Sequence, residues 1–349
     1  MVDSLTPVRG PVDPIIALRR CAFLLERRAE STYRVEAFRG AVRTVQDLTS
    51  TALAEAVASG TLTDLPGIGK STAGVISEAL DGRLPTYLKK LQDSGGGPLV
   101  KGGESYFAAI KGDLHTHSNW SDGGSPIYEM ALTGVELGHE YMVLTDHSPR
   151  LSIANGLSAQ RLTEQLAEVA TINEAMGSRL RLLTGIEVDI LDDGELDQTD
   201  DMLNKLDVVV ASVHSKLKMD SLGMTRRMLG AVRNEHTNVL GHCTGRLVTG
   251  GRGTRPQSKF DARRVFEACA EHNVAVEINA RPEREDPPDE LISLAMDIGC
   301  LFAIDSDAHA PGQLEMKAYG CARAERLGID LDIIVNTWDC ARLLDWAAT

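Results

Sequence analysis

The spacing of apolar residues changes near residue 100. Before this point, apolar residues recur every three to four positions, with arginines between them, over 15–28 and 33–48. The same spacing predicts shorter helices over 52–58 and 73–80. After this point, short apolar runs alternate with amphipathic stretches. The pattern predicts a small all-α region followed by a larger α/β region.

The α/β region contains seven short apolar runs that predict strands, over 112–115, 141–145, 180–188, 206–213, 238–241, 274–278 and 301–304. Helices are expected near 125–138, 158–176, 222–234, 260–272, 288–298, 313–327 and 331–347. Strands that are each followed by a crossover form a parallel sheet. Because about 250 residues of such units is the size of a (β/α) barrel, we expect one here.

A glycine-rich segment separates the two regions. It contains Ser94–Pro98, which holds three consecutive glycines, and Gly102–Gly103. We therefore expect a helical domain over 1–93, a linker over 94–108 and the barrel over 109–349.

Charge is unevenly distributed along the 349 residues, which carry a formal net charge of −14. The first 100 residues hold 12 Lys and Arg against 11 Asp and Glu, and the remainder holds 24 against 39. This balance excludes a wholly basic nucleic-acid coat, although a local nucleic-acid site is compatible with it.

Other classes of protein are disfavoured by simple features. No stretch approaches about 18 uninterrupted apolar residues, so no membrane span is expected. The first 14 residues lack the apolar core of a secretory signal. Six cysteines without a CxxC pair argue against a disulfide framework. The sequence predicts a soluble, cytoplasmic protein, and it leaves the oligomeric state open.

Six of the nine histidines follow predicted strands, as do three carboxylates. This set comprises His115, His117, Asp122, His147, Glu187, His214, His242, Asp307 and His309. Because the carboxyl ends of parallel barrel strands converge on one face, these side chains are expected to form a divalent-metal site. His139, His236 and His272 lie in or beside predicted helices, where we expect ordinary surface or packing residues.

Nine candidate ligands exceed the needs of one ion and fit two or three, with Zn, Mn and Fe all compatible. Such a centre suits the hydrolysis of phosphate esters. Lys216 and Arg246 are the first candidates to meet a substrate phosphate, and Arg281 and Arg284 are further ones. Two more polar residues at the end of a predicted strand, Glu277 and Asn279, are expected to orient ligands or waters.

The motifs 113–118, 120–123, 145–147, 185–187, 212–214, 241–242 and 307–309 together resemble the PHP (polymerase and histidinol phosphatase) domain. The resemblance implies a distorted (β/α)7 barrel with three metal ions. Its implied ligand sets are His115, His117, Glu187 and Asp307; Glu187, His214 and His242; and Asp122, His147 and His309. It also implies a metal-bound hydroxide, held by Glu187, His214 and His242, as the nucleophile. Some family members carry His where this chain has Asp122.

The segment 65–72, LPGIGKST, resembles a helix-hairpin-helix motif. Gly67 and Gly69 permit a tight turn, and Lys70 adds charge where backbone N–H groups at a helix start face a phosphate. Such contacts ignore sequence. An ordinary glycine-containing helix turn is the alternative interpretation. The GxxxxGK spacing of a Walker A loop is absent.

Residues 24–39 resemble the N-terminal small domain of family X DNA polymerases, whose bacterial members also carry a PHP domain. The chain resembles the two ends of such an enzyme without its polymerase core. Some relatives use a lysine on the helix after the hairpin for lyase chemistry. Here that helix region carries Val75, Ser77 and Arg83, which does not favour this activity.

Three functions remain as hypotheses. The first is a metal-dependent DNA phosphoesterase, acting as a 3′–5′ exonuclease or in 3′-end processing, a repair-type activity with DNA as partner. The second is a phosphatase of small molecules such as histidinol phosphate or nucleotides, favoured by the acidic barrel. The third is a non-catalytic DNA-binding protein, which the complete set of ligand-type residues argues against.

Overall fold

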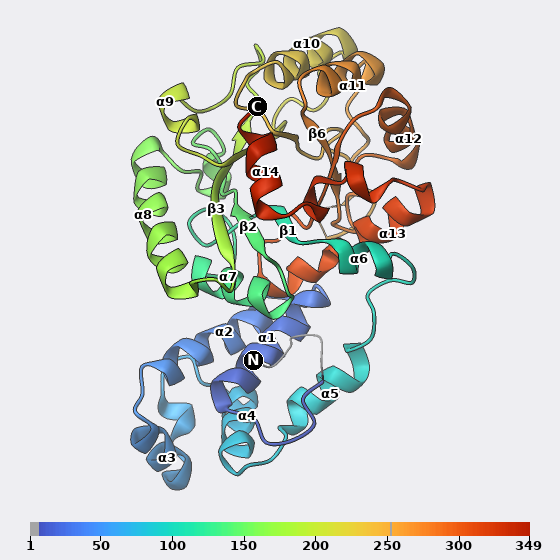
Figure 1. Cartoon of the computed structure of the whole chain (residues 1–349). Helices are drawn as coiled ribbons and strands as arrows, with labels where there is room; N and C mark the ends of the chain where they lie inside the picture. Colours follow the sequence, from blue (N-terminus) through green and yellow to red (C-terminus); the bar gives the residue numbers. More distant parts are fainter. Residues whose placement is uncertain (1–6, 252) are drawn as a thin grey trace. The chain divides into compact units, whose positions relative to one another are not determined.

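The computed structural model describes residues 7–251 and 253–349 (Figure 1). The chain folds into two compact units, one ending at Pro98 and the other beginning at Leu99. Within the described residues, none of the helices has the length and apolar character needed to cross a membrane.

The first unit is entirely helical. Its helices are α1 Pro14–Arg27, α2 Thr32–Gln46, α3 Ser50–Ser59, the 3-10 turn η1 Leu62–Asp64, α4 Lys70–Leu80 and α5 Thr86–Gly95. The Asp13 side chain accepts hydrogen bonds from Ile15 and Ile16, and Pro14 occupies the first turn, so α1 begins with two strong start signals. The four predicted helices are present, and α5 is an additional one.

A buried ion pair joins α1 to α2 inside this unit. Arg39 Nε and Nη2 donate to the two carboxylate oxygens of Glu26, at 2.8 Å each. Both side chains are almost completely buried. This bidentate geometry satisfies the buried charges while Leu18, Leu25 and Phe38 pack around them.

The second unit begins with α6 Glu104–Ala109 and contains seven strands. They are β1 Gly112–Thr116, β2 Tyr141–Leu144, β3 Arg181–Asp189, β4 Val208–Ser212, β5 Val239–Leu240, β6 Ala275–Asn279 and β7 Phe302–Asp305. The strands pair in sequence order, and each pairing is parallel. The predicted seven-stranded (β/α) barrel is therefore confirmed.

The helices of this unit follow the strands and lie around them (Figure 1). They are α7 Ile127–Glu136, α8 Ala159–Met176, α9 Asp200–Leu203, α10 Ser221–Val232, α11 Ala262–Glu271, α12 Asp289–Ile298, α13 Lys317–Leu327 and α14 Cys340–Ala347. Short 3-10 turns occur at η2 Ser152–Ala154, η3 Pro311–Met316, η4 Leu331–Ile333 and η5 Val335–Thr337.

The barrel is nearly closed between β1 and β7. Thr116 forms a parallel bridge with Ala308, and the His117 N–H donates to the Ala308 carbonyl at 2.8 Å. Asn336 bonds to both strands, since its amide donates to Asp305 and to the Gly112 carbonyl. A side chain from the C-terminal segment thus replaces part of the missing strand ladder.

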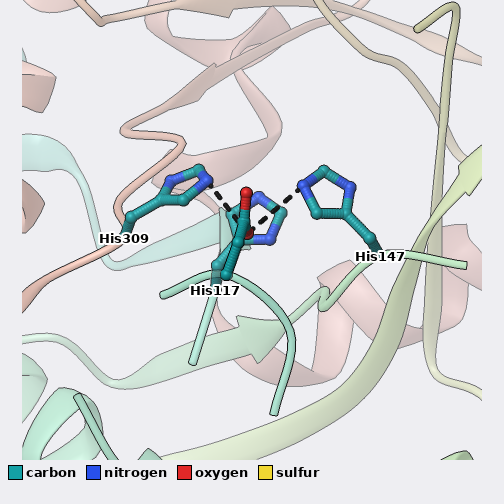
Figure 2. Close-up of side chains that lie close together, drawn as sticks. His117, His147 and His309 are labelled. Atoms are coloured by element: carbon teal, nitrogen blue, oxygen red, sulfur yellow. Dashed lines mark ion pairs between the residues drawn. The ribbon is translucent and has the colours of Figure 1, made fainter. Parts of the chain in front are cut away.

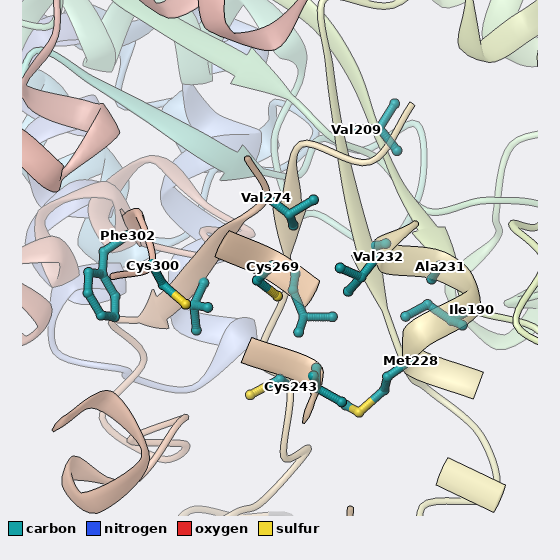
Figure 3. Close-up of a cluster of buried hydrophobic side chains, with 14 of the residues drawn as sticks. Ile190, Val209, Met228, Ala231, Val232, Cys243, Cys269, Val274, Cys300 and Phe302 are labelled. Atoms are coloured by element: carbon teal, nitrogen blue, oxygen red, sulfur yellow. The ribbon is translucent and has the colours of Figure 1, made fainter. Parts of the chain in front are cut away.

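Alternate residues of each strand pack into different clusters. Tyr141 and Val143 join a cluster with members from all seven strands, which places it inside the barrel, together with Trp338 and Leu343 from the C-terminal segment. The larger cluster between strands and outer helices includes Met228, Val232 and four free thiols, three of which are labelled in Figure 3. The labelled thiols are those of Cys243, Cys269 and Cys300, and the fourth is that of Cys321.

The structure differs from the sequence-based expectation in three segments. A helix was expected over 313–327, but its first four residues belong to the 3-10 turn η3 and α13 begins at Lys317. Residues 331–347 were expected to form one helix, but two 3-10 turns precede α14. Within 94–108, α5 continues to Gly95 and α6 begins at Glu104. Gly103 has a φ of +79° and lies so close to α13 that a Cβ would collide with the backbone of Ala322, so only glycine fits there.

A completely buried lysine, Lys317, neutralises the carboxylate of Asp113 in β1. Lys317 Nζ is 2.8 Å from Asp113 Oδ2, and both side chains have no exposed surface. Burial, followed by the charges of Asp113 and Glu277, raises the pKa of nearby Asp305 to about 8, which favours its protonated form. Lys317 therefore neutralises the negative charge of Asp113.

Replacing this lysine tests that balance. We expect Lys317→Met to lower the free energy of unfolding by about 3–5 kcal/mol, because Asp113 is left as an unpaired buried charge. Urea denaturation followed by tryptophan fluorescence reports on this unit alone, since Trp120, Trp338 and Trp346 all lie in it. The control is Arg263→Met, which removes an exposed pair and should cost at most about 0.5 kcal/mol. Equal losses in the two variants would contradict this account.

Candidate metal centre

The nine ligand-type residues named from the sequence all lie at or just after strand ends on one side of the barrel. His115 lies in β1 and Glu187 in β3, while the others occupy the segments that follow β1, β2, β4, β5 and β7. Parallel strands direct these segments to the same end. The structure therefore brings the whole predicted set together.

Glu187 lies at the centre of the cluster. Its Oε1 is 2.9 Å from His242 Nε2 and 3.2 Å from His214 Nε2. Its Oε2 is 2.9 Å from His147 Nδ1 and 3.3 Å from His115 Nε2. One carboxylate thus faces imidazoles from four different strand ends, which is the position of a bridging ligand.

A second carboxylate lies at the open side of the cluster. Asp122 Oδ1 is 3.4 Å from His147 Nε2 and 3.3 Å from His309 Nε2. Figure 2 shows the rings of His147 and His309 on opposite sides of the carboxylate to which dashed lines join them, with His117 between the two rings. A third carboxylate, Asp307, has its Oδ1 3.4 Å from His117 Nε2.

Four sets of side chains each bring their ligand atoms within 4.8 Å of one another. They are His117, Asp122, His147 and His309; His115, His117 and Asp307; His115, Glu187 and His242; and His147, Glu187 and His214. Every residue of the predicted set belongs to at least one group. Among the described residues, His139, His236 and His272 belong to none.

The donor atoms fit metal ions. Several buried atoms of the cluster form no hydrogen bond within the described part of the chain, namely His115 Nε2, His117 Nδ1 and Nε2, His147 Nδ1, His214 Nδ1, His242 Nδ1 and Glu187 Oε2. Each such buried polar atom costs about 1–3 kcal/mol when it stays unsatisfied. Mixed imidazole and carboxylate donors are those that Zn, Mn and Fe accept. The residues present therefore suit divalent ions.

The carboxylates and the burial of the cluster shift the pKa values of its histidines in opposite directions. Burial lowers the pKa of His147, but the charges of Glu187 and Asp122 outweigh it and raise that pKa to about 10. The pKa of Glu187 lies well below its usual value, since the surrounding imidazoles overcome the effect of burial. Burial, together with the charges of His309 and His147, lowers the pKa of His117 to about 3. Ions that bind to a histidine with a raised pKa, such as His147, compete with its proton.

Further residues hold the ligands in place. Glu277 Oε1 is 2.6 Å from His115 Nδ1, and the other oxygen accepts from the His242 backbone N–H. Asn279 Nδ2 donates to Asp307 Oδ2 at 3.1 Å. These contacts match the orienting role expected of Glu277 and Asn279 from the sequence.

Two supporting carboxylates were not identified from the sequence: Asp146, and Asp189, whose Oδ1 accepts from the His214 backbone N–H at 3.1 Å. Asp146 accepts hydrogen bonds from the Ser118 N–H, the Ser118 and Ser121 hydroxyls and Gln165 Nε2. It thereby fixes the turn that carries Asp122. Its position immediately before His147 was the available signal, but the sequence does not show which serines it contacts.

The candidate phosphate-binding cations occupy different surroundings. Lys216 is 63% exposed and pairs with Asp192, and Arg246 donates to the carbonyls of residues 284 and 285. Arg281 lies against the cluster, with Nη1 3.1 Å from both the Asp307 carbonyl and His309 Nδ1. Arg284 Nε is 3.3 Å from Asp307 Oδ2. Of the four cations, Arg281 and Arg284 contact cluster residues directly.

The hairpin residues of the first unit form a tight turn. Gly67 has a φ of +72°, and the Thr44 hydroxyl donates to the Pro66 carbonyl beside it. Gly69 is the N-cap of α4, and its N–H is bonded to the Thr72 hydroxyl. Lys70, the first residue of α4, is exposed. The turn thus presents a helix start and a cation to solvent.

A parallel barrel that gathers histidines and carboxylates at the carboxyl ends of its strands has the arrangement of a divalent-metal site suited to hydrolysis. Comparison with protein families gives the specific class: residues 113–281 match the PHP domain, and residues 13–83 match a helix-hairpin-helix domain. The chain thus carries a PHP domain, preceded by a helix-hairpin-helix domain.

Individual relatives match different parts of the chain. The protein "DNA polymerase/3'-5' exonuclease PolX" of Bacillus subtilis (strain 168) is 40% identical over 65% of this chain, a region that makes up 39% of the polymerase. The chain therefore spans about two fifths of that relative. A "Probable phosphatase" of Thermoanaerobacter sp. (strain X514) is 27% identical over 64% of this chain and 89% of its own length.

Among solved structures, histidinol phosphate phosphatase from Lactococcus lactis, in complex with zinc, L-histidinol and phosphate, aligns with a TM-score of 0.49 at 17% identity. The alignment covers 63% of this chain and 95% of that one.

The orienting role of Glu277 can be measured through metal binding. We expect Glu277→Gln to weaken divalent-ion affinity about 10–100-fold, because His115 loses the carboxylate that fixes its ring. The affinity is obtained by competition with a chelator of known strength. Glu271→Gln, on the outer helix α11, is the matched control and should leave the affinity unchanged. Unaltered affinity in Glu277→Gln would show that this contact is not needed for binding.

Proposed function

We propose that this protein hydrolyses phosphodiester bonds at the 3′ ends of DNA, as a 3′–5′ exonuclease or in 3′-end processing. The observation that carries the proposal is the presence of both a helix-hairpin-helix domain and a nine-residue metal cluster in one chain. The Bacillus relative, whose name includes 3'-5' exonuclease, is 40% identical to this chain over 65% of the chain's length. The polymerase function of that relative is not part of the proposal.

The nine clustered residues would hold two or three divalent ions. Glu187 would bridge between ions, since imidazoles approach both of its oxygens. Such ions supply Lewis acidity and lower the pKa of a bound water, so no serine or cysteine nucleophile is required. The catalytic role falls to Glu187, His214 and His242, as the family resemblance implies.

The protein's own cations would position the phosphate. Arg281 is fixed by Glu283 Oε1 at 2.8 Å and directs another nitrogen toward His309. Arg284 is mostly buried beside Asp307. These guanidinium groups offset part of the negative charge that carboxylates and substrate bring together. Lys216 and Arg246 remain candidates for phosphates farther along the strand.

The helix-hairpin-helix unit would hold the DNA backbone. The start of α4 combines the helix dipole, the glycine turn at Gly67 and Gly69, and the exposed charge of Lys70. These features bind phosphates and do not contact base edges, so binding is independent of the DNA sequence. DNA contact would therefore be local, as the near-neutral charge of the first 100 residues requires.

A small-molecule phosphatase is the second candidate. The "Probable phosphatase" relative matches over 89% of its own length, and the second unit carries a large excess of carboxylates. An acidic surface disfavours a long polyanion. The helix-hairpin-helix domain has no evident role in this alternative.

Hydrolysis of end-labelled DNA separates the two candidates. With Mn²⁺, we expect stepwise loss of 3′ nucleotides from single-stranded and nicked DNA. His115→Ala should reduce this activity at least about 100-fold, because loss of a ligand exceeds the effect of losing an orienting group. His236→Ala, outside the cluster, should retain full activity. Rapid phosphate release from histidinol phosphate with inert DNA would favour the phosphatase instead.

The DNA-holding role of the hairpin has its own test. Gly67→Val with Lys70→Glu should weaken DNA binding, because valine is strained at positive φ and the cation is reversed. The salt dependence of binding should fall by about one unit of slope for each lost phosphate contact. Lys89→Glu, an exposed lysine of α5 paired with Asp93, is the control. Unchanged affinity and slope in the hairpin variant would remove the hairpin from DNA binding.

A further inference from the structure

A cavity of about 390 Å³ lies beside the metal cluster, between the segment after β6 and the helices α12 and α13. Its volume is within the range of small-ligand pockets. Its walls include Asn279 at the end of β6, Arg281 just after it, Asp289 at the start of α12, and Tyr319 and Arg323 on α13. All of these residues belong to the second unit, so the cavity is formed within one compact body.

One wall of this cavity is shared with the cluster. Asn279 Nδ2 donates to Asp307 Oδ2, and Arg281 Nη1 donates to the Asp307 carbonyl, each at 3.1 Å. Arg281 Nη1 is also 3.1 Å from His309 Nδ1. A ligand in the cavity would therefore be separated from the metal-ligating side chains by one layer of residues.

The cavity gathers positive charge in an acidic unit. Its lining holds four arginines, Arg246, Arg281, Arg323 and Arg326. Three carboxylates line it as well, Glu285, Asp289 and Glu290. Over residues 101–349 the carboxylates outnumber the cations by 39 to 24, so this local balance is the reverse of its surroundings. An anionic ligand is the kind that such a lining attracts.

Arg323 is fixed and incompletely satisfied. Its side chain is only 10% exposed, and Nε and Nη2 bond Asp289 Oδ1 at 3.1 and 2.9 Å. The remaining nitrogen, Nη1, is buried without a hydrogen-bond partner in the part of the chain that the structure describes. Arg326 pairs with the same Asp289 but is 59% exposed, which leaves it free to reach a ligand. An incoming phosphate oxygen would pair with the exposed Arg326 guanidinium, and the fixed charge of Arg323 would add to the attraction.

The rest of the lining is apolar or flat. Tyr319, Pro282, Pro288, Ala322 and Val100 contribute to it. Such side chains pack against a sugar or a planar base, and aromatic rings stack with bases of any sequence. The lining thus combines phosphate-type donors with a surface for a ring. A nucleotide carries both of these groups.

We propose that this cavity is a nucleotide subsite. It takes one phosphate-bearing nucleotide of a DNA strand whose scissile phosphate lies at the metal cluster. The inference rests on the proposed function and deepens it, since the subsite distinguishes a nucleotide chain from a phosphomonoester that carries no nucleoside. A phosphomonoester without a nucleoside, such as p-nitrophenyl phosphate, fills the cluster and leaves the cavity without an occupant.

The subsite is tested with two cavity variants and one control. Arg326→Glu reverses an exposed cation, Tyr319→Ala removes the ring, and Arg263→Glu reverses an exposed arginine on α11 outside the cavity. Two quantities are measured on manganese-loaded protein. The first is the affinity for thymidine 5′-monophosphate by calorimetry. The second is kcat/KM for single-stranded oligothymidylate divided by kcat/KM for p-nitrophenyl phosphate.

We expect each cavity variant to weaken thymidine 5′-monophosphate binding and to lower the kcat/KM ratio, both at least tenfold. Arg263→Glu should change neither quantity. Thermal melting checks folding, and Arg326→Gln and Tyr319→Phe serve as milder variants with smaller losses in the same direction.

The outcomes separate the subsite from the proposed function. If DNA is hydrolysed but both cavity variants match the wild type, the subsite is wrong and the DNA activity stands. If wild-type protein binds no thymidine 5′-monophosphate, the subsite is likewise overturned. If DNA is inert but the cavity variants still lose nucleotide binding, the exonuclease proposal fails while the nucleotide site stands.

Discussion

The organisation of the second unit depends on one buried carboxylate surrounded by imidazoles. Glu187 faces histidines from four strand ends, and several of their nitrogens form no hydrogen bond within the described residues. Such a group is costly to bury unless something satisfies it. Divalent ions would satisfy this carboxylate and the imidazoles around it. Their attraction to the carboxylate would be strong, because the buried site has a low dielectric constant. The barrel, the orienting groups Glu277 and Asp146, and the closure by Asn336 all serve to hold these atoms together.

Charge compensation extends outward from that centre. Within the barrel, buried Lys317 neutralises Asp113 of β1, and burial raises the pKa of the neighbouring Asp305. In front, Arg281 connects Asp307 and His309 to the neighbouring cavity. An acidic protein can thus present locally positive groups where a phosphate would approach. The net charge of −14 describes the average surface and does not describe the surroundings of the cluster.

The sequence predicts the barrel and its ligand-type residues well, because both follow short-range rules. Apolar runs mark strands, and His or carboxylate residues at their ends must converge when the strands are parallel. Contacts between side chains that are far apart in the sequence are harder to predict from it. Lys216 and Arg246 precede Arg281 as phosphate candidates in the sequence, yet of these candidates only Arg281 and Arg284 touch the cluster. The break between η5 and α14 and the arginine-lined cavity depend on tertiary packing that periodicity does not encode.

Anomalous diffraction from crystals of the protein grown with Mn²⁺ tests the central claim most directly. The account predicts two or three strong manganese peaks within the cluster, with Glu187 between two of them and every one of the nine residues contacting an ion. Manganese peaks confined to other acidic groups, or a cluster that remains free of manganese at millimolar concentration, would contradict it.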